Sequence, residues 1–139
     1  MKLAFLEKFA DPVMKTPGGQ GAFLAGVVLG MIARGQASGD KLDSAPLFKQ
    51  LNFGRMRKRE LKRHLSRVPQ LIKAYDLKYK DSDLKERIQD LAGYADELLL
   101  KDESFDLGVD GNFAFATAFM NAPEYFWTVF GKQQKETEN

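Results

Sequence analysis

The residues best suited to chemistry form one dense basic run. Between Arg55 and Arg67, seven of thirteen residues are lysine or arginine and Glu60 is the single acid. In a helix, Leu61 and Leu65 would turn inward, which spreads the cations over the outer surface within reach of successive phosphates. The run predicts a nucleic-acid-binding helix; the alternative is a solvated face, which ordinarily interleaves acids. The seven cations are Arg55, Arg57, Lys58, Arg59, Lys62, Arg63 and Arg67.

Such a helix would hold the sugar–phosphate backbone rather than read bases. No Asn or Gln lies among the cations for bidentate contact with adenine, although the arginines could contact guanine. Residues 1–80 contain 16 Lys and Arg against 6 Asp and Glu, whereas residues 81–139 contain 5 against 13. This asymmetry favours a basic face for a polyanion and an acidic face in solvent or on a basic protein. Weaker binding candidates, chosen because they lie near predicted loops of the basic half, are Arg34, Lys41 and Lys49.

Nothing in the chain predicts catalysis, a cofactor or a metal. Cysteine is absent, which excludes thiolate sites and disulfides. The one histidine, His64, lies in the basic run without a serine or carboxylate at a catalytic spacing, so we expect a solvated or phosphate-facing ring. The glycines of residues 17–21 lack the Gly-Lys-Ser/Thr ending of a P-loop, and residues 106–117 lack the ligands of a calcium loop. We expect a protein that is not an enzyme.

The elements that position the basic run are predicted to be helical. Residues 21–34 are apolar nearly all round, and Ala22, Gly26 and Gly30 form a small-residue stripe that permits close helix contact. Pro69 interrupts the repeat of residues 57–79, so we expect a kink or a fresh helix capped by Ser66. Further short or amphipathic helices are predicted at residues 2–10, 47–51, 83–101 (opened by a capping box from Asp83 to Glu86) and 124–130.

Half of the sixteen aromatic residues lie between Phe105 and Phe130. Residues 113–119 alternate in part and could form a strand, but no second strand is available to pair with them. We expect the aromatic residues to form core, with part of their surface covered by a protein partner. Base stacking is the least favoured use because cations are nearly absent between Asp102 and Phe130. The acids of residues 81–110 are expected on the solvent side of a helix.

The sequence therefore predicts an all-α fold, a single compact bundle of about five or six helices over residues 1–130, with a polar, disordered tail at 131–139. The longest apolar run, residues 22–33, is too short to cross a bilayer, and the first residues do not resemble a signal peptide. A cytoplasmic location is expected.

Three segments together resemble, in order, the C-terminal domain of the large subunit of type I-B CRISPR Cascade. They are AFLAGVVLGMIARGQ, PLFKQLNFGRMRKRELKRHLSRVPQLIKAY and GNFAFATAFMNAPEYFW, and the resemblance covers roughly residues 20–130. That domain is also made as a separate small subunit from a start inside the large-subunit gene, and this chain looks like that product.

The resemblance implies a non-catalytic helical bundle that assembles in more than one copy along an RNA-guided antiviral complex. Its implied partners are the Cascade large and backbone subunits, further copies of itself, guide RNA and target DNA, with the target or displaced strand stabilised in the R-loop. The basic run occupies the place of the family's basic helix. The competing hypothesis is a structural adaptor that holds protein partners through its aromatic C-terminal region.

Overall fold

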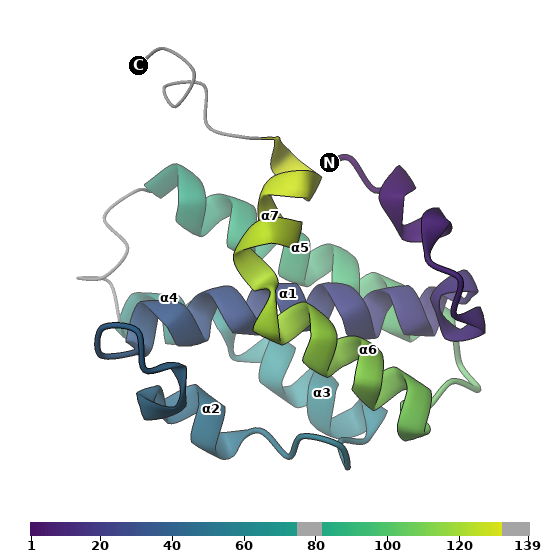
Figure 1. Ribbon diagram of the computed structural model, residues 1–139, viewed down its shortest axis with the longest axis horizontal. Coiled ribbons are helices and arrows are strands. Elements are labelled where there is room, and N and C mark those ends of the chain that lie inside the picture. The colour runs from purple at the N-terminus through teal and green to yellow at the C-terminus, as the bar shows by residue number, and fades with distance from the viewer. Residues whose placement is uncertain (75–81, 132–139) are drawn as a thin grey trace.

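The computed structural model describes residues 1–74 and 82–131. In this part of the chain the regular elements are helices, and no strand is present (Figure 1). The all-α prediction is confirmed. The bundle contains more helices than predicted because the chain restarts at Pro69 and adds single turns around its loops. The proposed tail and the end of the helix predicted over 57–79 lie largely outside the described residues. The α-helices are α1 (Pro17–Gln36), α2 (Pro46–Gln50), α3 (Lys58–Ser66), α4 (Val68–Ala74), α5 (Ser82–Lys101), α6 (Gly108–Met120) and α7 (Ala122–Phe130), and the 3-10 helices are η1 (Ala4–Lys8), η2 (Pro12–Lys15) and η3 (Leu42–Ser44).

Helix α1 is the centre of the molecule. It runs through the middle of the bundle and packs chiefly against α5, α6 and α7 (Figure 1). Every residue from Gly21 to Ala33 is buried, which is what an apolar surface on all sides requires of a helix in water. No helix among residues 1–74 and 82–131 is both long and apolar enough to cross a membrane.

The predicted small-residue stripe of α1 is the place where neighbouring helices come closest. A Cβ atom on Gly30 would lie 2.6 Å from both the carbonyl oxygen of Phe119 and the Cβ of Ala122, and one on Gly26 would collide with the carbonyl oxygen of Phe115. Glycine lets the backbones of α1 and α6 approach to a distance that no side chain permits. The prediction of close helix contact is confirmed.

The break between α3 and α4 has the form of a fresh helix start. Helix α3 ends at Ser66, α4 begins at Val68, and Pro69 lies in the first turn of α4, where its missing N–H costs nothing. The predicted cap by Ser66 is wrong, because its hydroxyl donates a hydrogen bond of 2.7 Å to the carbonyl of Arg63 in its own last turn. The amide of Leu71 instead donates to the carbonyl of Arg67.

Three other local predictions need correction. The helix predicted at 2–10 is the shorter 3-10 helix η1. The strand alternative for 113–119 is wrong, because these residues lie within α6. Helix α5 already includes Ser82, so Asp83 lies in the first turn rather than at the cap, and its carboxylate pairs with Arg87 at 3.3 Å.

Candidate nucleic-acid interface

The cations of the basic run divide into two groups on α3. Arg59 and Arg63 of α3, and Arg67 directly after its last residue, are exposed and follow one another at four-residue spacing. Leu61 and Leu65 are buried on the inner side of the helix. Four residues advance about 6 Å along a helix axis, so this outer arginine row lies nearly parallel to the helix. The predicted buried face is confirmed for Leu61 and Leu65. The predicted spread of the cations over the outer surface holds for the three arginines but is wrong for Lys58 and Lys62, which are half-buried.

The remaining cations of α3 are tied to the opposite half of the chain. The Nε of Arg57 lies 2.7 Å from an oxygen of Asp106, and the Nζ of Lys62 lies 2.7 Å from an oxygen of Asp96. The Nζ of Lys58 donates to a backbone carbonyl between α5 and α6 at 2.7 Å. These tethered cations, Arg57, Lys58 and Lys62, fix the orientation of α3. Arg55 is exposed in the segment before the helix.

Asp106 is the N-terminal cap of α3, supplied from a distant part of the chain. Its Oδ1 accepts hydrogen bonds from the backbone amides of Lys58, at 2.7 Å, and Leu107, at 2.9 Å. Burial alone would raise the pKa of Asp106, but the hydrogen bonds from the Lys58 amide and the Arg57 side chain outweigh it and hold the pKa below its usual value. The carboxylate therefore stays ionised at the positive end of the helix dipole.

Asp102 has a similar role at the start of α1. Its Oδ2 accepts a hydrogen bond from the amide of Gly18 at 2.9 Å, beside the cap formed by Thr16 on Gly19. The expectation that the acids of 81–110 simply follow a solvent-facing side is therefore wrong for Asp102 and Asp106, which satisfy helix amides.

A buried amide fixes the chain as it enters α3. Asn112 of α6 accepts a hydrogen bond from the Met56 amide at 2.9 Å and donates to the Met56 carbonyl at 3.1 Å and to the Gly108 carbonyl at 2.7 Å. All of these groups lie in or beside the core, where an unpaired amide is costly. Sequence reasoning missed Asn112, whose only signal was a polar residue inside an apolar stretch.

The three weaker binding candidates lie on other elements. The guanidinium of Arg34 donates to the carbonyls of Gly30, Phe119 and Met120 at 2.8 to 3.0 Å, so it fastens the C-terminal end of α6 to α1. Lys41 precedes η3 and Lys49 lies in α2, and both are exposed. None of these three belongs to the outer arginine row.

The prediction of a solvated or phosphate-facing His64 is wrong. The side chain is buried, and within the described residues its Nδ1 has no hydrogen-bond partner. Burial lowers the pKa of His64, the nearby Arg67 and Arg63 lower it further, and Glu60 opposes them. The ring is therefore a neutral core group of α3, because an unpartnered imidazolium would be costly in this position.

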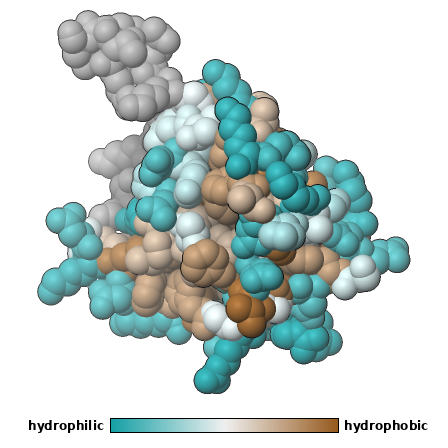
Figure 2. All heavy atoms as spheres, turned by 45° about the vertical axis from the view of Figure 1, so that its right-hand side comes forward, coloured by the Kyte–Doolittle hydropathy of each residue, from teal (hydrophilic) through white to brown (hydrophobic). Residues whose placement is uncertain are grey.

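The aromatic C-terminal region is mainly core, with an exposed remainder. Phe115, Phe119 and Phe126 are fully buried. In contrast, Phe113 is 68% exposed and Val109, one turn before it, is 84% exposed on the outer side of α6. Figure 2 shows hydrophobic side chains gathered on the lower part of one face between hydrophilic ones. The expectation of a mainly buried aromatic region with some surface left open agrees with these exposures. That a protein partner covers this surface stays a prediction.

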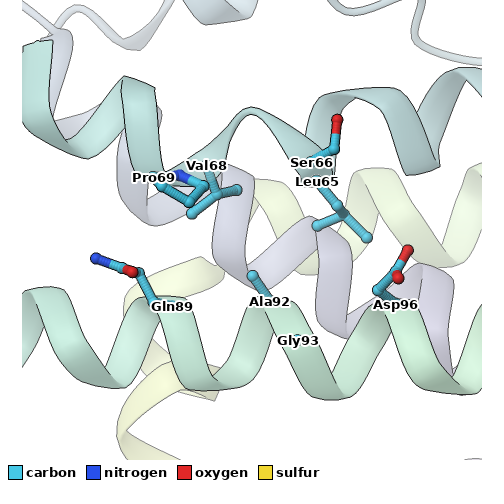
Figure 3. A pocket seen from close by; sticks show the side chains of 8 residues that line it. All are labelled: Leu65, Ser66, Val68, Pro69, Gln89, Ala92, Gly93 and Asp96. Carbon is cyan, nitrogen blue, oxygen red and sulfur yellow. The ribbon is translucent and has the colours of Figure 1, made fainter.

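A shallow groove lies between the α3–α4 junction and α5 (Figure 3). Its volume is about 260 Å³, and Leu65 and Val68 point down into it toward Ala92 of α5. Gly93 lines the same groove, and a Cβ atom there would meet nothing within 4 Å. Within the described residues, no group of three or more His, Asp or Glu side chains could hold a metal ion.

Residues 2–133 match the family described as the CRISPR-associated protein TM1802 C-terminal domain. The chain belongs to this family. It is a CRISPR Cascade component, as the resemblance of its three segments predicts. No curated protein and no solved structure matches it.

Proposed function

We propose that this domain is a non-catalytic subunit of a type I-B RNA-guided surveillance complex, which holds nucleic acid through the outer arginine row of α3 and thereby stabilises the R-loop. The observation that supports it is the row itself. Arg59 and Arg63 are exposed on one side of α3, and Arg67, also exposed, follows at the same spacing directly after the last residue of the helix. Guanidinium groups so placed can contact phosphates along one strand.

Binding of this kind needs no base readout. In RNA-guided complexes base pairing supplies the sequence specificity, and the protein contributes contacts to the backbone. The tethered cations and the Asp106 cap hold α3 in one orientation before any ligand arrives. A preorganised row loses less conformational entropy on binding than the same arginines on a mobile segment would. The proposed partners are guide RNA and target DNA, together with the Cascade large subunit, backbone subunits and further copies of the chain.

Charge reversal of the row tests the proposal. The triple variant Arg59→Glu, Arg63→Glu, Arg67→Glu should abolish binding of a fluorescent 20-nucleotide single strand, measured by anisotropy, while the helical circular dichroism is unchanged. The matched control reverses Lys2, Lys8 and Lys15, which are exposed in the N-terminal segment, are not binding candidates and carry the same total charge. It should lower affinity only slightly. Equal losses in the two triple variants would contradict a localised interface.

The salt dependence gives a second measure of the same contact. Neutralising roughly three to five phosphates of a single strand predicts a slope of log affinity against log salt of about −2 to −4. A flat response would exclude a backbone contact.

The second candidate is a protein adaptor, and the exposed side of α6 favours it. Val109, Phe113 and Met120 are each more than half exposed and lie on that helix, and apolar surface of this kind often marks a protein contact. Affinity purification from native cells with and without nuclease separates the two. Partners that remain after nuclease treatment, with no protected nucleic acid, would favour the adaptor.

A further inference from the structure

Phe105 lies in the segment between α5 and α6, and its ring packs against the backbone at two glycines. A Cβ atom on Gly18 would overlap the Phe105 ring, and one on Gly111 would lie 3.3 Å from its Cζ. The ring therefore rests directly on the backbone of α1 at Gly18, where only glycine fits, and packs closely on Gly111 of α6. Its position is fixed by the start of α1 and the start of α6, and the side chain is half-buried.

The rest of the ring borders a basic hollow. This hollow is open, has a volume of about 480 Å³ and is bordered by Phe105, by Glu103 and Asp106, and by four cations of the basic run. The start of α3 and the segment that joins α5 to α6 lie at the same end of the molecule (Figure 1), where Asp106 connects them. The cations are Arg57, Lys58, Arg59 and Lys62.

The charges of the hollow are not all available to a ligand. Asp106 is already paired with Arg57, and Lys62 is shared with Asp96 outside the hollow. Arg59 is exposed, and its guanidinium forms no hydrogen bond or ion pair with another described residue. It belongs to the outer arginine row and to the border of the hollow. A phosphate bound by Arg59 would therefore have an aromatic ring beside it.

We infer that Phe105 and Arg59 form a subsite for one unpaired nucleobase and its adjoining phosphate. This inference rests on the proposed function and goes further, because it requires a single strand. A rigid aromatic ring beside a cation is the arrangement that single-stranded nucleic acid uses, with the base stacked and the phosphate neutralised. A base that is paired and stacked within a duplex cannot enter.

The proposed subsite uses base stacking, which the sequence alone favours least among the uses of the aromatic region. That argument considered cations along the chain between Asp102 and Phe130, where they are nearly absent. The fold brings cations from the start of α3, more than forty residues earlier, to the edge of Phe105. The relevant neighbours of the ring are spatial and not sequential.

The test uses the whole chain and four labelled 12-mers of the same sequence: single-stranded DNA, single-stranded RNA, DNA with abasic sites at its four central positions, and a DNA duplex. The tightest single strand should bind about fivefold or more tightly than the abasic strand, the lower end of the effect of base–aromatic stacking. Tighter binding of DNA would assign the base to a DNA strand, and tighter binding of RNA to the guide.

The variants separate stacking from packing. Phe105→Leu should remove the difference between the base-bearing and abasic strands, whereas Phe105→Tyr should keep it. Phe113→Leu, an exposed ring on the outer side of α6, is the matched control and should change nothing. If Phe105→Leu fails to fold, the preference of the unaltered chain for the base-bearing DNA strand over the abasic strand decides. Glu103→Gln should tighten binding, because it removes a negative charge from the hollow.

The outcomes also distinguish the two proposals. Equal binding of abasic and base-bearing strands, with the salt dependence intact, would overturn the subsite and leave the backbone interface standing. Failure of the unaltered chain to bind any of the four 12-mers would overturn the proposed function, and the subsite with it.

Discussion

The same substitution, glycine to alanine, should change the free energy of unfolding in opposite directions at two positions. Gly93 lies inside α5, where an added Cβ meets nothing within 4 Å. Gly93→Ala should therefore stabilise the protein by about 0.5–1 kcal/mol, because alanine loses less backbone entropy in a helix than glycine does. Gly30→Ala places its Cβ 2.6 Å from the Phe119 carbonyl oxygen and from Ala122.

The cost at Gly30 can be worked from that distance. Ordinary contacts begin at 3.4 Å, so the two helices must separate by roughly 0.8 Å (3.4 − 2.6), and a backbone carbonyl cannot rotate away as a flexible side chain can. Overpacking costs about 1–3 kcal/mol. A rigid neighbour places Gly30→Ala toward the upper end, and about 1 kcal/mol of helix propensity offsets part of it. The net expectation is a loss of about 2 kcal/mol.

Urea unfolding followed by circular dichroism at 222 nm measures both changes under one set of conditions. The midpoint should rise for Gly93→Ala and fall for Gly30→Ala, with similar m-values. A Gly30→Ala variant as stable as the parent chain would refute the close approach of α1 to α6 and α7. If Gly93→Ala lowers the midpoint instead, another part of the chain must pack against α5 at residue 93.

Two further predictions concern the side chains of Arg34 and His64. Arg34→Met should destabilise the protein by about 1–2 kcal/mol in urea unfolding, because carbonyls at the end of α6 lose a charged donor, and nucleic-acid affinity should not change. A large loss of affinity in a folded variant would instead make Arg34 part of the interface. His64 has a lowered folded-state pKa, so its contribution to stability is present above its unfolded pKa of about 6.5 and is lost as the pH falls below it. His64→Leu should shrink the difference between unfolding midpoints at pH 7.5 and pH 5.5, and an unchanged difference would show that other groups cause it.

Periodicity and glycine spacing were enough to predict the helices and the core. The buried face of α3, the restart at Pro69 and the close contact at Gly26 and Gly30 all follow from local pattern, because burial of one face and the missing amide of proline act over a few residues. What local pattern could not supply is contact between distant segments.

The candidate site shows this limit most clearly. The sequence identified the seven cations but could not divide them into an outer row and a tethered group. That division is made by Asp96, Asp102 and Asp106, which lie more than thirty residues away. His64 was misplaced for a local reason: it follows Leu61 by three residues and so lies beside the buried face, but its polar ring and the cations around it indicated solvent.

The burial of α1 on every side bears on how the chain is made. The helix spans residues 17–36, yet the elements that cover it, α5, α6 and α7, begin at residues 82, 108 and 122. During synthesis this apolar segment leaves the ribosome well before its covering surfaces exist, and the native contacts have large sequence separation. The chain therefore depends on a late, cooperative collapse. In cells, shortage of a chaperone or truncation before α7 should show first as aggregation through α1.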